Sequence, residues 1–198
     1  MSQAIPPVAV LVTHKVADYK TWKQAFDDHK PARQEASCVG HDVHRGIDDP
    51  DTVTIYNPAA DVDKLKAFLD GTELPEAMLR AGVQGAPTVT LMKPMSASFP
   101  GDRLLPGIVV THDVEDYDRW RTYYDDFDER RKQLGIVNHA VNQVLGQPNR
   151  VVIYHQAEQI DTLHAFLESA ELRDIMQAAG VVGAPDIRFV QSVDIAEY

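Results

Sequence analysis

Residues 12–22 read VTHKVADYKTW, and residues 110–120 read VTHDVEDYDRW. The match continues without a gap from residues 8–93 onto residues 106–191, with 32 of the 86 aligned positions identical. Agreement over that length does not arise by chance, and a fixed internal period means that one structural unit is repeated. The chain of 198 residues is therefore predicted to be a tandem duplication.

The duplication predicts two domains, a first repeat over residues 1–93 and a second repeat over residues 106–198. Residues 94–105 between them contain two prolines, one glycine and two serines. That composition is typical of a linker. We therefore expect two similar domains joined by a short irregular segment.

Each repeat is predicted to begin with a strand and a helix. The apolar run over residues 8–13 has the length of a strand and is apolar on both faces, so both sides of its sheet should be covered. Asp18 and Asp116 stand where a helix N-cap belongs, ahead of aromatic residues with helical spacing. Pro31 should kink or end the first copy's helix, whereas Glu129 at the matching position should impose no break.

The rest of each repeat predicts two strands, a second helix and a last strand. Residues 39–45 and 53–56 have the pattern of a strand pair around a turn rich in aspartate. The second helix should begin after Asp61 and run on through Met78. The fourth strand should follow Pro87, and the second repeat carries matching signals.

This order of elements, with both helices on one face of the sheet, is the ferredoxin-like split unit, so the chain is predicted to be α+β. Helices cover one face of such a sheet, and the second copy is the simplest cover for the other face. Two repeats packed sheet to sheet would form a pseudo-dimeric α+β barrel within one chain. We expect this chain to act as a monomer or to form a homodimer of itself.

Composition and charge exclude several kinds of partner. The formal net charge is −11, the sequence pI is about 5.0, and the longest cationic run spans only residues 130–132, so nucleic acid is not expected as a partner. No stretch has the character of a membrane span or a signal peptide, so we expect no membrane association and a cytoplasmic protein. Cys38 is the single cysteine, which rules out an internal disulfide and a clustered thiolate metal site.

Several motifs together resemble those of one known family. They are His-x-Val-x-Asp-Tyr-x-x-Trp at residues 14–22, the Gly40-His41 step, Asp-Asp-Pro-Asp at residues 48–51, and Ala-Gly-Val-x-Gly-x-Pro at residues 81–87. The chain resembles the antibiotic-biosynthesis-monooxygenase-like, or cyclase-like, bacterial subfamily of the dimeric α+β barrel superfamily. The resemblance extends over nearly the whole of both repeats.

This resemblance implies a fold and a pocket, but no ligand. It implies that each repeat has a pocket between its helices and its sheet. Cofactor-independent monooxygenases, polyketide cyclases, haem-degrading enzymes, muconolactone isomerase and ligand-sensing domains all share the superfamily's scaffold. Because one fold serves so many functions, the function has to come from the residues of the pocket.

His14 and His112 are the candidate acid–base residues. Each ends the first strand of its repeat immediately before the helix, where the fold implied by the resemblance opens onto the pocket. An imidazole has a pKa near neutrality and could remove a proton from an acidic carbon or a phenol. Alternatively, each histidine orders the turn between strand and helix.

His41 and His139 lie on the predicted second strands and are candidate pocket residues. If His14 and His41 point to the same face, each repeat contains a pair of imidazoles. Two imidazoles and a carboxylate such as Asp18 could form a facial metal site, but this spacing matches no known metal signature. We therefore expect no metal and no cofactor.

The aromatic residues Tyr19, Trp22, Tyr117 and Trp120 are the other candidate pocket residues. Their helical spacing favours core packing, and a pocket between helix and sheet would still have them as walls. The two copies differ at two places where one has histidine and the other asparagine, namely positions 44 and 142 and positions 57 and 155. Two pockets that differ in this way need not do the same job.

Arg33 and Arg131 occupy matching positions late in the first helix of each repeat. Acidic neighbours in the sequence favour solvated or ion-paired side chains. Anion binding is the alternative interpretation.

Together these features favour a small-molecule pocket protein. The leading hypothesis is a cofactor-independent monooxygenase or cyclase-type enzyme that acts on an aromatic or polyketide-like compound. A non-catalytic ligand-binding or structural protein is the first alternative. A haem-binding or haem-degrading protein, with a histidine as axial ligand, is the second.

Overall fold

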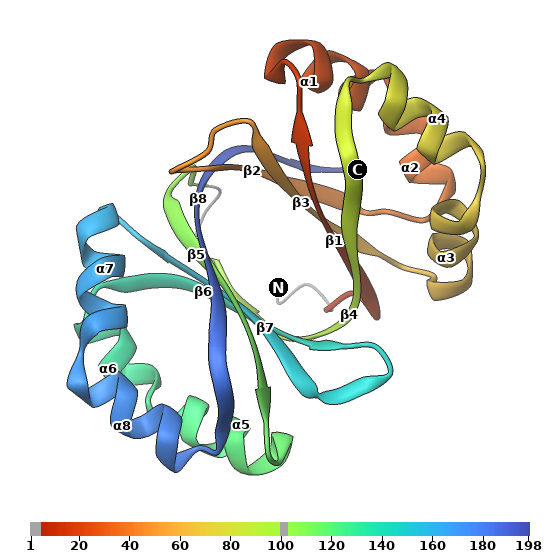
Figure 1. Cartoon of the computed structure of the whole chain (residues 1–198). Coiled ribbons are helices and arrows are strands. Elements are labelled where there is room, and N and C mark those ends of the chain that lie inside the picture. Colours follow the sequence, from red (N-terminus) through yellow and green to blue (C-terminus); the bar gives the residue numbers. More distant parts are fainter. Residues whose placement is uncertain (1–4, 100–102) are drawn as a thin grey trace. The chain divides into compact units, whose positions relative to one another are not determined.

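The computed structural model describes residues 5–99 and 103–198 (Figure 1). The chain divides into two compact units. The first unit comprises the described residues up to Met92 together with Ser192–Tyr198, and the second comprises the described residues of Lys93–Gln191.

The elements of the two repeats follow the same order. Those of the first repeat are β1 (Val8–Val16), α1 (Tyr19–Asp28), α2 (Lys30–Glu35), β2 (Gly40–Gly46), β3 (Thr52–Ala59), α3 (Val62–Asp70), α4 (Glu73–Arg80) and β4 (Val83–Ser98). Those of the second repeat are β5 (Pro106–Val114), α5 (Tyr117–Asp126), α6 (Asp128–Gln133), β6 (Ile136–Val144), β7 (Gln147–Ala157), α7 (Ile160–Glu168), α8 (Ala170–Ala178) and β8 (Val181–Glu197).

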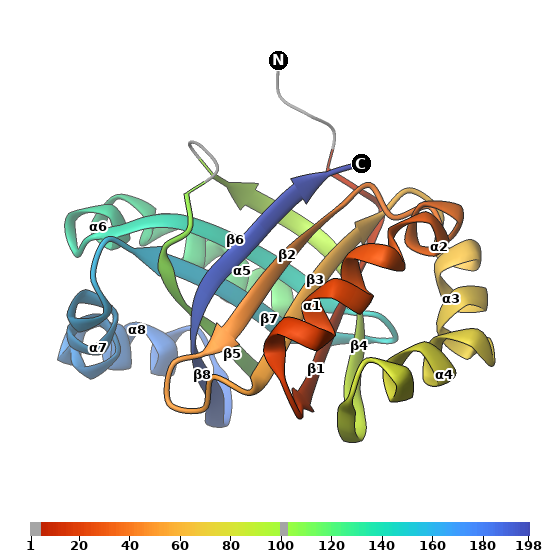
Figure 2. The same ribbon diagram turned by 90° about the horizontal axis from the view of Figure 1, so that it is seen from above.

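The sheet of each unit is antiparallel and has the ferredoxin-like strand order. In the first unit β3 pairs with β1 and β2, and β4 pairs with the other edge of β1, which gives the order β2-β3-β1-β4. In the second unit the matching order is β6-β7-β5-β8. Figure 2 shows helices α1 to α4 on one side of the strands of the first unit. The predicted α+β class with two ferredoxin-like repeats is confirmed.

The core of each unit lies between its sheet and its helices. Along β1, Val8, Val10 and Val12 alternate onto the face that meets the helices, where they pack with Trp22 and Leu65. Burying each of these large apolar side chains contributes roughly 1.5–3 kcal/mol. The period of two along the strand therefore fixes which residues can face a pocket on the helix side.

The predicted N-caps are confirmed. The carboxylates of Asp18, Asp116 and Asp61 accept hydrogen bonds from the backbone N–H groups of Thr21, Arg119 and Lys64, at 2.8, 2.7 and 3.0 Å. Each satisfies a donor that the first helical turn leaves without a partner.

The prediction that Pro31 breaks the first helix in one copy alone was wrong. The helix breaks in both copies, at His29 and at Phe127, with the same backbone conformation (φ −84° at each). In each unit an arginine from the following helix donates to a carbonyl oxygen just before the break: Arg33 to Phe26, and Arg131 to Tyr124. The break therefore accompanies a tertiary hydrogen bond and does not depend on proline.

Two further boundaries differ from the expected ones. The second helix is interrupted after Asp70, so α3 and α4 are separate helices. Strand β4 begins at Val83, ahead of Pro87. Its pairing with β1 shifts register between Gln84 and Thr88. A proline, which has no N–H to donate, fits into such an irregularity, so the strand can include Pro87.

The linker expected over residues 94–105 is strand in its first part. Strand β4 continues to Ser98, and Lys93–Ser98 belongs to the second unit. The reason is that the second unit uses these residues: Met95 packs against its core, and Ser96 accepts a hydrogen bond from Arg121 at 2.8 Å. Residues 100–102 of the expected linker lie outside the described residues. No helix among the described residues is long and apolar enough to cross a membrane.

Candidate functional site

The second unit contains a cavity of about 250 Å³ between its sheet and its helices. Most of its lining is aliphatic or aromatic. The polar side chains that reach it are His112, Tyr124, Arg131, His155 and Arg173. An apolar cavity with a few polar groups is the usual form of a small-molecule site.

His112 is the most unusual group in this cavity. It is 5% exposed, and neither ring nitrogen has a hydrogen-bond partner among the described residues. Burial lowers the pKa of His112 to about 4, so the imidazole is neutral at neutral pH. Its ring meets Trp120 edge to face, with the ring centroids 5.9 Å apart. A buried polar group without a partner is costly, so His112 has its hydrogen-bonding capacity available for a ligand.

The cavity also contains a cluster of three polar side chains that contact one another, namely Tyr124, His155 and Arg131. The hydroxyl of Tyr124 lies 2.9 Å from Nε2 of His155, while Nδ1 of His155 has no partner among the described residues. Burial is the main cause that lowers the pKa of His155 well below its usual range, and the charge of Arg131 adds to it. Both members of the pair are therefore neutral, since burial also raises the pKa of Tyr124. The guanidinium of Arg131 lies 3.7 Å above the ring of Tyr124 and pairs with the carboxylate of Asp128 at 2.9 Å.

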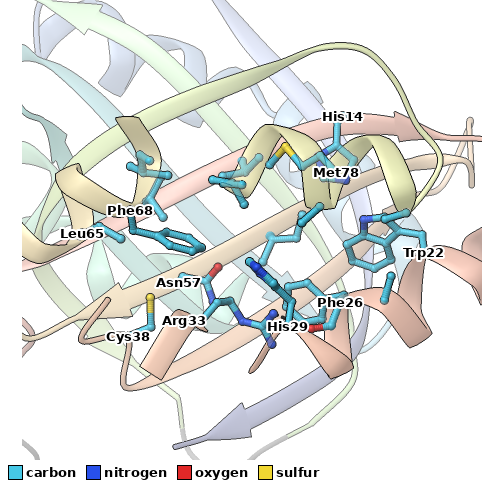
Figure 3. Close-up of a pocket in the computed structure, with 18 residues that line it drawn as sticks. His14, Trp22, Phe26, His29, Arg33, Cys38, Asn57, Leu65, Phe68 and Met78 are labelled. Carbon is cyan, nitrogen blue, oxygen red and sulfur yellow. Dashed lines mark hydrogen bonds between the residues drawn. The ribbon is translucent and has the colours of Figure 1, made fainter. Parts of the chain in front are cut away.

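The first unit has a smaller cavity at the matching place, of about 80 Å³ (Figure 3). Its polar lining consists of His14, His29, Arg33, Cys38 and Asn57. His14 is 6% exposed, has both ring nitrogens unpartnered among the described residues, and has a pKa lowered to about 4 by burial. It repeats the geometry of His112, with its ring 5.7 Å from that of Trp22. Burial raises the pKa of Cys38 to about 11, so its thiol stays protonated.

The predicted pair of His14 and His41 does not form. His41 is absent from the cavity lining, and its Nε2 lies 2.8 Å from the carboxylate of Asp194 while its Nδ1 lies 2.9 Å from the hydroxyl of Tyr198. The reason is the strand order, because β3 lies between β1 and β2. His139 is likewise absent from the lining in the second unit and meets the ring of Tyr124 edge to face.

The four predicted aromatic residues divide into two kinds. Trp22 and Trp120 line the cavities of their units, next to His14 and His112. Tyr19 and Tyr117 do not line them. Both tyrosines stand at the start of their helix and pack against the neighbouring tryptophan, with ring centroids 5.7 and 5.8 Å apart.

Asn57 and His155 line the cavities, although the sequence marked them only as a difference between the two copies. Each lies on the third strand of its repeat, directly opposite a buried residue of the first strand: Asn57 opposite Val10, and His155 opposite Ile108. The available signal was a polar residue that interrupts the apolar alternation Val53, Ile55 on the helix-facing side of β3. No group of three or more metal-binding side chains occurs among residues 5–99 and 103–198.

Comparison with known proteins identifies the fold. No protein-family model matches the chain, and no curated protein does. Among solved structures, an anthrone oxidase-like protein matches 97% of this chain and 93% of its own at a TM-score of 0.70 and 13% identity. A proposed monooxygenase from Lactobacillus acidophilus matches 97% and 96% at a TM-score of 0.65 and 9% identity. A ferredoxin-fold protein from Listeria monocytogenes, related to antibiotic biosynthesis monooxygenases, matches 96% of each chain at a TM-score of 0.55 and 6% identity.

The chain has the dimeric α+β barrel fold. At these identities the likeness concerns the fold alone. It agrees with the fold implied by the resemblance drawn from the sequence motifs. What the cavities bind has to be argued from their own residues.

Proposed function

We propose that the second unit binds a small aromatic compound with an acidic C–H or O–H group and that His112 accepts that proton. The reaction would be a cofactor-independent oxygenation or a cyclisation. The observation that carries this proposal is the unpartnered, buried imidazole of His112 at the wall of a 250 Å³ apolar cavity. Burying an imidazole without a hydrogen-bond partner destabilises the protein. A ligand that bonds to His112 would remove this cost, which gives a physical reason for the histidine at this position.

The dimensions of the cavity limit the ligand. Small-molecule sites commonly measure roughly 300–1,000 Å³. The cavity of about 250 Å³ lies just below that range, so it favours a small ligand, such as a compound of two or three fused rings. A haem macrocycle is larger than such a compound. The haem-binding alternative is therefore not supported by this cavity.

The chemistry follows from the neutral state of the polar groups. His112 with a pKa of about 4 is a weak base in the empty cavity. Proton transfer from a bound substrate would create an imidazolium next to a substrate anion, and that attraction in a dry site raises the pKa of the imidazole. If the Tyr124 hydroxyl donates to Nε2 of His155, Nδ1 of His155 carries a proton and can donate to the substrate anion.

The oxygenation balances without a bound cofactor. A CH₂ group between aromatic rings loses a proton to His112, and the resulting carbanion reduces O₂. One oxygen atom becomes the product carbonyl and the other leaves as water, so that CH₂ and O₂ give C=O and H₂O. The substrate supplies all four electrons. The name of one structural neighbour, an anthrone oxidase-like protein, makes anthrone the first compound to test.

The test uses the two tryptophans, of which each unit has one beside its candidate histidine. In a Trp22→Phe background, Trp120 alone reports on the cavity of the second unit. Anthrone should change the fluorescence of Trp120 and should be converted to anthraquinone with uptake of one O₂. His112→Leu should abolish turnover, whereas the matched change His14→Leu should leave it intact.

Two outcomes separate the alternatives. Binding of anthrone without turnover in the parent protein would support a non-catalytic ligand-binding protein. Turnover that persists in His112→Leu would rule out His112 as the base.

A further inference from the structure

We propose that the cavity of the first unit is a binding site for a short aliphatic carboxylate, held by Arg33 and His29. This site is separate from the cavity of the second unit and does not depend on the function proposed there. Its ligand class follows from an unbalanced buried charge, a second free donor and the size of the cavity.

Arg33 is a buried cation without an anionic partner. Its side chain is 4% exposed and lines the cavity. Nε donates to the hydroxyl of Tyr198 at 2.7 Å, and Nη1 donates to the carbonyl oxygen of Phe26 at 2.6 Å. The guanidinium also lies 3.6 Å above the ring of Phe26. All three partners are neutral, and Nη2 has no partner among the described residues.

The second unit shows what is missing. There, Nη2 of Arg131 donates to the carboxylate of Asp128 at 2.9 Å. The position that matches Asp128 in the first repeat is occupied by Lys30, whose ammonium lies 4.7 Å from the centre of the ring of Tyr198. The first unit therefore has a second cation where the second unit has the counter-ion. Buried charges are normally paired, so an anion from outside is the simplest compensation.

His29 supplies a second donor in the same cavity. It replaces Phe127 of the second repeat, and its Nε2 has no hydrogen-bond partner among the described residues. The nearest carboxylate oxygen, from the exposed Glu73, is 3.8 Å away, which is beyond hydrogen-bonding distance. Figure 3 shows His29 and Arg33 close together on one side of the pocket. An anion placed between them would satisfy both.

The rest of the cavity selects the type of anion. A volume of about 80 Å³ has room for only a few non-hydrogen atoms beyond a carboxylate. Leu65, Phe68 and Met78 also line it and would contact a short alkyl chain. An aliphatic monocarboxylate such as acetate, propionate or butyrate fits both features. A bare inorganic anion would leave the apolar part empty.

The experiment measures binding of propionate to a Trp120→Phe protein, in which Trp22 alone reports on this cavity. Propionamide is the neutral isostere, and chloride is the inorganic anion. We expect propionate to bind with a dissociation constant on the order of 1 mM, and propionamide and chloride to bind at least about tenfold more weakly. Equal binding of propionamide would overturn the role of charge. Equal binding of chloride would overturn the carboxylate class.

The deciding variant is Lys30→Asp, which gives the first unit the counter-ion of the second without removing Arg33. It should weaken propionate binding by roughly tenfold or more, because the new carboxylate occupies Nη2. Lys20→Asp is the matched control, since it makes the same charge change on an exposed part of α1. Unchanged affinity in Lys30→Asp would overturn the proposal, and so would an equal loss in Lys20→Asp.

Discussion

Replacing His112 with leucine should stabilise the ligand-free protein. The imidazole is 5% exposed, and neither nitrogen has a partner among the described residues. A buried polar group without a partner costs about 1–3 kcal/mol, whereas leucine has a similar size and no polar atom. The free energy of unfolding of His112→Leu should therefore rise by about 1–3 kcal/mol. For a chain of this size, each kcal/mol raises the melting temperature by roughly 2–4 °C.

His155→Leu is the matched control within the same cavity. Nε2 of His155 is hydrogen-bonded to the hydroxyl of Tyr124, so leucine leaves that hydroxyl unpaired. The same chemical change should therefore stabilise the protein less than His112→Leu does, because the unpaired hydroxyl offsets the removal of the unpartnered Nδ1. A smaller gain in His155→Leu than in His112→Leu would show that the hydrogen bond to Tyr124 stabilises the core.

The assay is equilibrium unfolding in urea at pH 7.5 without ligand, followed by circular dichroism. A change in midpoint with an unchanged slope means that stability itself has changed. If His112→Leu unfolds at lower urea concentration than the parent, the imidazole stabilises the empty protein. That result would refute the inference that His112 is reserved for a ligand.

Three further predictions concern pH, backbone and packing. The free energy of unfolding should fall as pH drops from about 6.5 to about 4, because the unfolded chain protonates His112 in that range and the folded chain does not. His112→Leu should reduce this dependence of stability on pH, as measured by thermal unfolding at a series of pH values. Pro31→Ala should leave the helix break at His29 in place, since the second repeat breaks without a proline, and backbone NMR shifts confined to residues next to position 31 would agree. Gly107→Ala should cost about 1–3 kcal/mol in urea unfolding, because the new methyl would lie 2.6 Å from the ring of Tyr154; an unchanged midpoint would contradict the packing at this position.

Much of the fold could be predicted because its signals are local. The duplication is visible in the sequence, and the order of strands and helices follows from apolar periods of two and of 3.6. The caps at Asp18, Asp61 and Asp116 follow from the need of each helix start for an acceptor. The structure places His14 on the same face of β1 as Val8, Val10 and Val12, which is the face that meets the helices.

The helix breaks and the ends of β4 could not be predicted in this way. The break at His29 accompanies the hydrogen bond from Arg33 to a carbonyl one turn earlier. Strand β4 extends past Lys93 because the core of the second unit uses Met95. The first joins residues seven positions apart across the helix break, and the second joins β4 to the core of the second unit, so local propensity contains neither.

The sequence by itself predicted first strands that end at His14 and His112, whereas the strands run two residues further, to Val16 and Val114. Only the tertiary structure decided which other polar side chains line the cavities with these histidines. Because β3 lies between β1 and β2, Asn57 and His155 reach the cavities and His41 and His139 do not. The missing counter-ion of Arg33 is likewise a result of the tertiary structure, because it depends on which side chains surround the guanidinium in the folded chain. Strand order and burial set these neighbours, and neither is visible along the chain.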